Sequence, residues 1–188
     1  MFNKSMPIFI LLTMLALCGQ SHAYAAENKT EFSSFVDEKG TISFPKDFRK
    51  TMSHLGSWFV PAGDASGFHD VYAQKADVTA FRKTGAFPDG ALLVKELRAS
   101  SAGDYTTGKN VSFANATIKQ WFVMIKDSKN RFPKNKNWGN GWGWALFKTD
   151  NPDVNVSIDY QKDCLGCHLP AKDNDWVYIE AYPTLTGR

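Results

Sequence analysis

Apolar residues along much of this chain recur at every second position, which is the pattern of half-buried β-strands. The alternation is clearest over residues 142–149, where Trp142, Trp144 and Leu146 alternate with Gly143 and Ala145. Four further strands are predicted on the same grounds, over residues 69–74, 91–99, 119–126 and 176–181. The pattern therefore predicts a sheet built from strands that are close in sequence.

A first helix is predicted where the spacing changes from two to three or four. Phe44-Pro45-Lys46-Asp47 is expected to open it, and Phe48, Met52 and Leu55 recur at helical spacing. Gly56 is expected to end it. This predicts an amphipathic helix of about three turns.

A second, shorter helix is predicted over residues 78–83, with Asp77 as its cap and Gly85 as its stop. Polar or glycine- and proline-rich segments are expected to be loops or turns, namely residues 57–67, 87–90, 100–109 and 127–141. Together these elements predict a β-rich α+β fold, an antiparallel sheet with a few short helices, rather than a helical bundle.

Composition and charge add little to this picture. The chain carries 22 basic and 19 acidic side chains, a nearly even balance that gives no case for nucleic-acid binding. Aromatic residues are plentiful, with 14 Phe, 6 Trp and 6 Tyr, which suits either a β-rich core or a pocket for a large flat ligand.

The first 25 residues are predicted to be a secretory signal peptide. Lys4 supplies its positive end, residues 8–17 form an apolar run too short to span a bilayer comfortably, and Ala23-Tyr24-Ala25 offers a cleavage site. Cys18 falls within this segment, in a poor match to a lipoprotein box. The mature chain, residues 26–188, is predicted to be a single domain in the periplasm, with no later stretch apolar enough to cross a membrane.

The strongest chemical signal is Cys164-Leu165-Gly166-Cys167-His168, the C-x-x-C-H pentapeptide that attaches haem c near the C-terminus. Two residues between the cysteines allow one short turn to present both thiols to one porphyrin edge, and the adjacent histidine becomes an axial ligand. A redox dithiol or half of a zinc site are the alternatives. No βαβ pattern supports the first, and no second pair of ligands at motif spacing supports the second.

A sixth ligand would convert such a haem into an electron carrier. Met52 and Met124 lie among apolar residues and are predicted to be core, while His54 is predicted to be solvated. His69, which begins a strand after a glycine-rich loop, is the best alternative ligand. None has the flanking pattern of an electron-transfer cytochrome, so the iron is predicted to be five-coordinate.

Several blocks resemble the cytochrome P-460 and cytochrome c′-beta family of small periplasmic proteins with one haem c. The resemblance rests on Phe44-Pro45-Lys46-Asp47-Phe48-Arg49, on Phe81-Arg82-Lys83-Thr84-Gly85-Ala86-Phe87-Pro88-Asp89-Gly90, on Val94-Lys95-Glu96-Leu97, and on the haem motif followed by Tyr182-Pro183. It covers nearly all of the mature chain in the expected order. It implies a β-rich domain, a homodimer, His168 as the proximal ligand and an open distal site.

The resemblance implies one of two functions. The P-460 branch oxidises hydroxylamine and bears a lysine bonded to the haem macrocycle, and Lys95 matches that lysine. Alternation places Lys95 on the strand face of Leu93 and Leu97, where a charge is costly unless it is paired, neutral or bonded. A lysine that reaches water from a strand end is the alternative explanation.

The c′-beta branch binds nitric oxide beneath distal phenylalanines, and Phe59 and Phe87 are the candidates for that role, with ordinary core packing as the alternative. Hydroxylamine oxidation also calls for a distal carboxylate to accept protons. Asp159, five residues before Cys164, is a weak candidate for it.

We therefore carry three hypotheses in decreasing order of preference. The first is a haem c protein that binds nitric oxide, the second is a hydroxylamine-oxidising enzyme, and the third is an electron-transfer cytochrome with a redox partner. The first is preferred because Phe59 and Phe87 predict an apolar distal wall.

Overall fold

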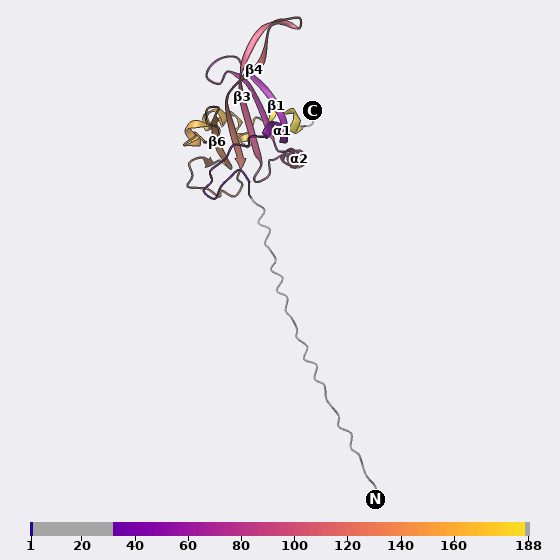
Figure 1. Ribbon diagram of the computed structural model, residues 1–188, viewed down its shortest axis with the longest axis vertical. Helices are drawn as coiled ribbons and strands as arrows, with labels where there is room; N and C mark the ends of the chain where they lie inside the picture. The colour runs from indigo at the N-terminus through magenta and orange to yellow at the C-terminus, as the bar shows by residue number, and fades with distance from the viewer. Residues whose placement is uncertain (2–31, 187–188) are drawn as a thin grey trace. The chain divides into compact units, whose positions relative to one another are not determined.

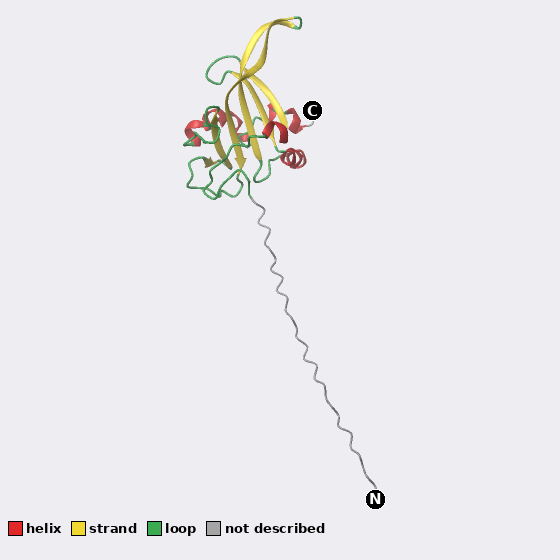
Figure 2. Cartoon of the chain, in the orientation of Figure 1, coloured by secondary structure: helices red, strands yellow, loops and turns green. Residues whose placement is uncertain are grey.

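The computed structural model describes Met1 and residues 32–186. The predicted signal peptide, apart from Met1, lies outside the described residues. Six strands form one antiparallel sheet in the order β1-β2-β3-β4-β6-β5 (Figures 1 and 2). Their bounds are Ser53–Val60 (β1), Gly67–Ala73 (β2), Leu92–Tyr105 (β3), Gly108–Lys126 (β4), Trp138–Gly139 (β5) and Trp142–Lys148 (β6). The predicted β-rich antiparallel fold is confirmed.

The hairpin of β3 and β4 is longer than predicted and extends beyond the rest of the sheet (Figure 1). Residues 100–109, predicted to be a loop, instead continue β3, turn at Thr106 and Thr107, and begin β4. Ser100 pairs with Ala114, and Tyr105 with Gly108. The prediction was wrong because small and polar side chains give no alternation signal in a ribbon whose faces are both largely exposed.

The first predicted helix is only one turn long. α1 covers Phe48–Thr51, and Met52 is already extended, with ψ 163°. Leu55 lies in β1, where the β1–β2 register shifts between His54 and Gly56. A short turn followed by a strand irregularity thus reproduced the helical spacing of buried residues. The loop predicted over 57–67 is confirmed over residues 61–66, whereas residues 57–60 belong to β1 and Gly67 begins β2.

The second predicted helix is confirmed and is longer at both ends. α2 covers Lys75–Thr84, and Gly85 ends it in the left-handed conformation at φ 76°. Gln74 holds the cap position instead of Asp77. The buried Asp77 carboxylate accepts a hydrogen bond from the backbone N–H of Leu92 at 3.0 Å, and burial raises its pKa.

The C-terminal part is a series of short helices: α3 (Tyr160–Asp163), α4 (Leu165–His168), two 3-10 helices, η1 (Leu169–Asn174) and η2 (Ile179–Ala181), and α5 (Pro183–Thr186). The strand predicted over 176–181 is absent from the described structure. Val177 and Tyr182 are buried there because this segment packs across the sheet rather than joining it.

The two faces of the sheet bury different parts of the chain. We call the face of Leu93 and Met124 the C-terminal face, because its core also contains Cys164, Val177 and Tyr182. The opposite side is the N-terminal face, whose core contains Ile42, Phe48, Met52, Leu92, Val94 and Phe147. None of the helices in the described part of the chain has the length and apolar character needed to cross a bilayer.

Candidate functional site

The C-x-x-C-H turn is held in place by hydrogen bonds from the segment before it. The carboxylate of Asp159 accepts from the Gln161 backbone N–H at 3.1 Å and so caps α3. The Asp163 carboxylate lies 3.0 Å from Ser157 Oγ and accepts from the Ile158 backbone N–H at 3.0 Å. These bonds orient the loop so that Cys164 begins the next turn at a fixed place.

The two cysteines are unbonded and differ in exposure. Cys164 is buried against the C-terminal face, whereas Cys167, one turn later, is exposed. Burial raises the pKa of the Cys164 thiol to about 11. A redox-active dithiol needs a lowered thiol pKa, so this environment opposes that alternative. Among the described residues, no group of three His, Cys, Asp or Glu side chains is placed to hold a metal ion.

The imidazole of His168 has one nitrogen engaged and the other available. Its Nδ1 lies 2.7 Å from the carbonyl oxygen of Trp176, and because a carbonyl only accepts, Nδ1 carries the proton. The ring stands edge-on to Trp144, with centroids 4.9 Å apart. Burial, with a smaller effect from the Lys95 ammonium, lowers the pKa of His168 to about 4. The Nε2 lone pair is thus free to ligate a metal, in the tautomer that metal-binding histidines adopt.

Lys95 lies on the C-terminal face, as its alternation with Leu93 and Leu97 predicted. Its Nζ is 4.0 Å from the centre of the Phe122 ring, the residue opposite it on β4. No carboxylate among the described residues forms an ion pair with it. The residue keeps some exposed surface, but its ammonium is enclosed by protein, and this burial lowers the pKa to about 8.

His69 is nearly buried on the same face, with 4% of its surface exposed. Its Nε2 donates to the carbonyl oxygen of Ala65 at 2.8 Å, and its ring stacks on Trp58 with centroids 4.9 Å apart. Nδ1 is left without a hydrogen-bond partner. Burial and the nearby charge of Lys95 lower the pKa of His69, so this nitrogen is an acceptor at neutral pH.

Cross-strand pairing arranges these side chains in two adjacent rows. One row runs Val71, Lys95, Phe122 and Leu146 across four strands, and the next runs His69, Leu97, Gln120 and Lys148. Phe122 and Leu146 are only partly buried, unlike the core rows beside them. The described residues of these two rows include no carboxylate. The site is therefore a surface of mixed character, in which apolar side chains from both rows lie beside the Lys95 ammonium, the His69 ring and the free nitrogen of His168.

Comparison with known families bears on this arrangement. The family model described as Cytochrome P460 matches residues 45–179, which is well over half of the chain. The chain belongs to the cytochrome P460 family. No curated protein matches the sequence at a significant level. Membership in the cytochrome P460 family implies a haem cofactor.

The residues present fit a haem. A neutral histidine with a free Nε2, two unbonded thiols one turn apart, and partly exposed apolar side chains of Phe122 and Leu146 provide a ligand, attachment points and an apolar surface. Sequence reasoning missed Phe122 and Trp58 because their place depends on strand register, which only the pairing of distant segments determines.

The predicted distal residues are not brought together. Phe59 pairs with Phe68, the two rings are tilted with centroids 4.9 Å apart, and Phe59 is 39% exposed on the N-terminal face, away from Lys95. Its neighbour Trp58 points to the C-terminal face instead. Phe87 is buried on the C-terminal face, where it packs against Phe81 at 4.8 Å.

The remaining candidate residues make contacts that belong to the fold and not to the site around His168. The Asp159 carboxylate is used as the helix cap of α3. Met52 and Met124 are buried in the two cores, as predicted, and Met52 is not in a helix. His54 is half-exposed, and its Nε2 lies 3.0 Å from Ser57 Oγ and 3.4 Å from Asp70.

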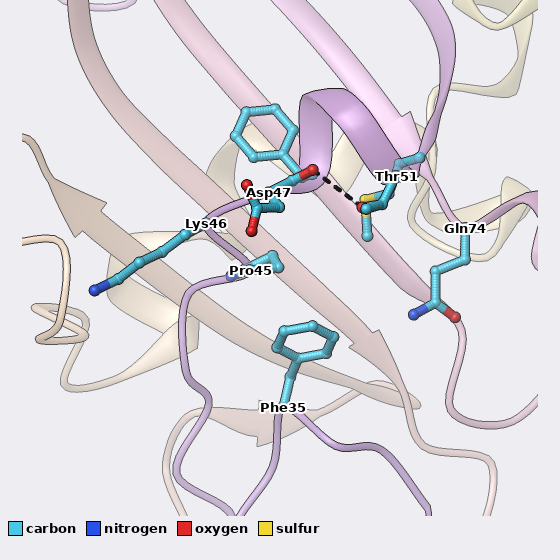
Figure 3. Close-up of a pocket in the computed structure, with 8 residues that line it drawn as sticks. Phe35, Pro45, Lys46, Asp47, Thr51 and Gln74 are labelled. Atoms are coloured by element: carbon cyan, nitrogen blue, oxygen red, sulfur yellow. Dashed lines mark hydrogen bonds between the residues drawn. The ribbon is translucent and has the colours of Figure 1, made fainter.

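A separate pocket opens beside α1 (Figure 3). It is lined by Phe35, Pro45, Lys46, Asp47, Phe48, Thr51, Met52 and Gln74. Inside it, the hydroxyl of Thr51 donates to the backbone carbonyl of Asp47 at 3.0 Å. Phe48 and Met52 belong to the core of the N-terminal face, so this pocket is distinct from the site around His168.

Proposed function

We propose that this member of the cytochrome P460 family is a haem c protein whose five-coordinate iron binds nitric oxide. Cys164 and Cys167 would hold the haem through thioether bonds, and Nε2 of His168 would be the protein ligand to the iron. When bound, the haem supplies a redox-active iron that takes small nitrogen-containing ligands. The observation that carries the proposal is that the described residues of the two rows beside His168 include no carboxylate, and that Phe122 and Leu146 give the first row an apolar part.

His168 is oriented for this role before any ligand is bound. The hydrogen bond from Nδ1 to the Trp176 carbonyl fixes the tautomer, and the edge-on contact with Trp144 restricts ring rotation. Both contacts strengthen the histidine as a ligand because they reduce the entropy lost on binding. Among the described residues, Met52 and Met124 are occupied by core packing, which supports five-coordination.

The absence of a carboxylate from the described residues of the rows favours nitric oxide over substrates that must lose protons. Phe122, Leu146 and Trp58 offer no proton acceptor. Oxygen bound to ferrous haem accumulates negative charge and needs a hydrogen-bond donor, whereas nitric oxide depends less on one. His69 cannot supply that donor from its free Nδ1, which is an acceptor at neutral pH, and the Lys95 ammonium can supply it only until it loses its proton or is bonded.

Lys95 supports a second candidate, hydroxylamine oxidation. Its lowered pKa, about 8, leaves part of the amine neutral near neutral pH, and a neutral amine is the form that forms a covalent bond. A bond between Lys95 and the macrocycle would place the protein in the hydroxylamine-oxidising branch. His69 Nδ1, which is free on the same face, would then be a candidate acceptor for substrate protons in place of Asp159.

We also propose that the protein is exported to the periplasm and that it forms a homodimer. Export rests on the predicted signal peptide, and it agrees with haem c attachment outside the inner membrane. The homodimer rests on the family resemblance.

Anaerobic titration of the reduced protein with nitric oxide, followed by absorption, tests the proposal. We expect an ordinary high-spin ferrous spectrum that converts completely on adding nitric oxide, and no turnover of hydroxylamine with an artificial acceptor. Steady hydroxylamine turnover would replace the proposal by the second candidate. A low-spin spectrum that ignores nitric oxide would contradict both.

A further inference from the structure

The hydrogen-bond partner of His168 lies in a strained stretch of backbone. Asp175 and Trp176 both have positive φ angles, 55° and 65°, and neither is a glycine. This left-handed region is unusual for a residue as bulky as tryptophan, and such conformations persist only where the surrounding structure holds them. The carbonyl oxygen that accepts from His168 Nδ1 belongs to Trp176, so the strain lies at the group that orients the proposed iron ligand.

Two side chains from the sheet hold Asp175 in this conformation. Lys126 Nζ, at the end of β4, donates to Asp175 Oδ1 at 2.7 Å. The indole Nε1 of Trp142, which is opposite Lys126 on β6, donates to the backbone carbonyl of Asp175 at 2.9 Å and lies 3.3 Å from Oδ1. We call Lys126, Trp142 and Asp175 the proximal clamp.

The two sheet residues of the clamp are largely enclosed. Trp142 is fully buried in the core of the C-terminal face, and the Lys126 side chain is 13% exposed. The Lys126 ammonium also lies 5.0 Å from the centre of the Trp142 ring. An ammonium enclosed in this way is less screened by salt than one at the surface, and its position is fixed by the ring beside it.

The backbone carries this restraint to His168. The Trp176 N–H donates to the Ala171 carbonyl at 2.9 Å, and the Val177 N–H donates to the Asn174 carbonyl at 3.1 Å, so the chain turns back tightly toward the haem motif. Asp175 directly precedes Trp176 in this turn. A change in the backbone of Asp175 therefore moves the carbonyl that accepts from His168.

We propose that the proximal clamp sets the strength of the hydrogen bond from His168 to Trp176 and, through it, the electron donation from His168 Nε2. A histidine that donates from one ring nitrogen is a stronger ligand through the other. A well-aligned bond should therefore stabilise ferric over ferrous iron and lower the reduction potential. Lys126 and Asp175 act through Trp176, so they are positioning residues and not ligands. The inference rests on the proposed ligation by His168 but not on which small ligand the iron binds.

Potentiometric titration of the full haem-loaded protein, with resonance Raman spectra of its ferrous form, tests the proposal. Lys126→Met and Asp175→Ala break the clamp from opposite sides. Both should favour ferrous iron by about tenfold, a rise of about 59 mV for one electron, and both should lower the iron–histidine stretching frequency. Asp175→Asn should stay closer to wild type, because an amide oxygen still accepts hydrogen bonds and asparagine tolerates a positive φ.

The charge changes make the result specific. If these residues acted on the iron only through space, Lys126→Met would remove a positive charge and lower the potential, whereas Asp175→Ala would remove a negative charge and raise it. Shifts of opposite sign would therefore overturn the proposal. If Asp175→Ala does not fold, the sign of the shift in Lys126→Met decides alone.

A matched control is Arg131→Met, which removes the ion pairs to Asp89 and Asp127 beside Phe32, a residue packed against the core of the N-terminal face. It should leave both the potential and the stretching frequency unchanged. An equal shift in this control would show a general effect of lost stability and overturn the proposal.

The inference and the proposed function fail in different ways. A ferrous wild-type protein without an iron–histidine band would refute His168 as the ligand, and the clamp with it. A wild-type band and potential that Lys126→Met and Asp175→Ala both leave in place would refute the clamp alone, because the packing of the buried Val177 would then be enough to hold the Trp176 carbonyl.

Discussion

Lys95 and Glu96 are adjacent on β3, yet the charge of Glu96 is compensated by a neighbouring cation and that of Lys95 has no counter-charge among the described residues. Glu96, on the N-terminal face, is 1% exposed, and its Oε2 accepts from the Arg49 guanidinium and from Trp121 Nε1, the latter at 2.9 Å. Arg98 Nε lies 4.0 Å from its other oxygen. Lys95, on the C-terminal face, has an aromatic ring as its neighbour and no counter-charge among the described residues.

This difference separates a structural charge from a functional one. Buried charges are usually compensated, because an unpaired one costs several kcal/mol of desolvation. Glu96 follows that rule and fastens α1 to the sheet through Arg49. Lys95 departs from it beside His168 and the thiols, and departures of this kind concentrate at functional sites.

Breaking the Glu96 pair should have the largest effect. Arg49→Ala would leave a buried carboxylate with only the more distant Arg98, and we expect the free energy of unfolding to fall by about 2 kcal/mol, discounted because Arg49 is half-exposed. Lys95→Met should leave stability equal or higher. Denaturant unfolding of both variants checks this, and a larger loss for Lys95→Met would reverse the comparison.

Lys95 should also give stability a pH dependence of definite sign. Its pKa in the folded protein is about 8, below the 10.5 of an exposed lysine, so between these values the unfolded chain binds more protons. Stability contributed by Lys95 therefore rises with pH across this window, by at most about 1.4 kcal/mol per pH unit. Comparing wild type with Lys95→Met from pH 7 to 10.5 isolates it. Parallel curves would mean that Lys95 is bonded or solvated.

The two aromatic neighbours on β1 sharpen the contrast between faces. Trp58→Ala opens the C-terminal face beside His69 and should change the nitric oxide association rate of the reduced protein by about tenfold. Phe59→Ala, on the N-terminal face, should leave that rate unchanged while keeping the fold. Stopped-flow measurement of both variants checks this prediction. A large effect of Phe59→Ala alone would mean that the ligand binds on the N-terminal face and not on the C-terminal face proposed here.

The smallest effect is expected at Asp159. Asp159→Ala removes the cap of α3 and should lower stability by about 1 kcal/mol, and Asp159→Asn should restore most of it, because an amide oxygen also caps. Hydroxylamine or nitric oxide reactivity should not follow the charge. Loss of reactivity in Asp159→Asn at unchanged stability would instead make this carboxylate a proton acceptor.

Features fixed by local chemistry were predictable from the sequence. Alternation identified 142–149 and the face of Lys95, Gly85 marked a helix end, and the spacing of Cys164, Cys167 and His168 indicated a haem site. These signals depend on neighbours along the chain, so no tertiary information was needed.

The remainder depended on contacts between distant segments. Whether Trp58 or Phe59 faces Lys95 is decided by the register of β1 against β2, since a shift of one residue exchanges the faces. The approach of Phe122 to Lys95 likewise follows from pairing of β3 with β4. The irregularity near His54 changed the spacing of the buried residues, so the sequence predicted a helix where the structure has the start of strand β1.

Tryptic mass mapping of the purified, denatured protein tests the central claim most directly. The account predicts that the peptide of residues 163–172, with Cys164, Cys167 and His168, carries the mass of one haem, while cleavage after Lys95 yields that lysine unmodified. Haem released free on denaturation, with both cysteines unmodified, would contradict the account.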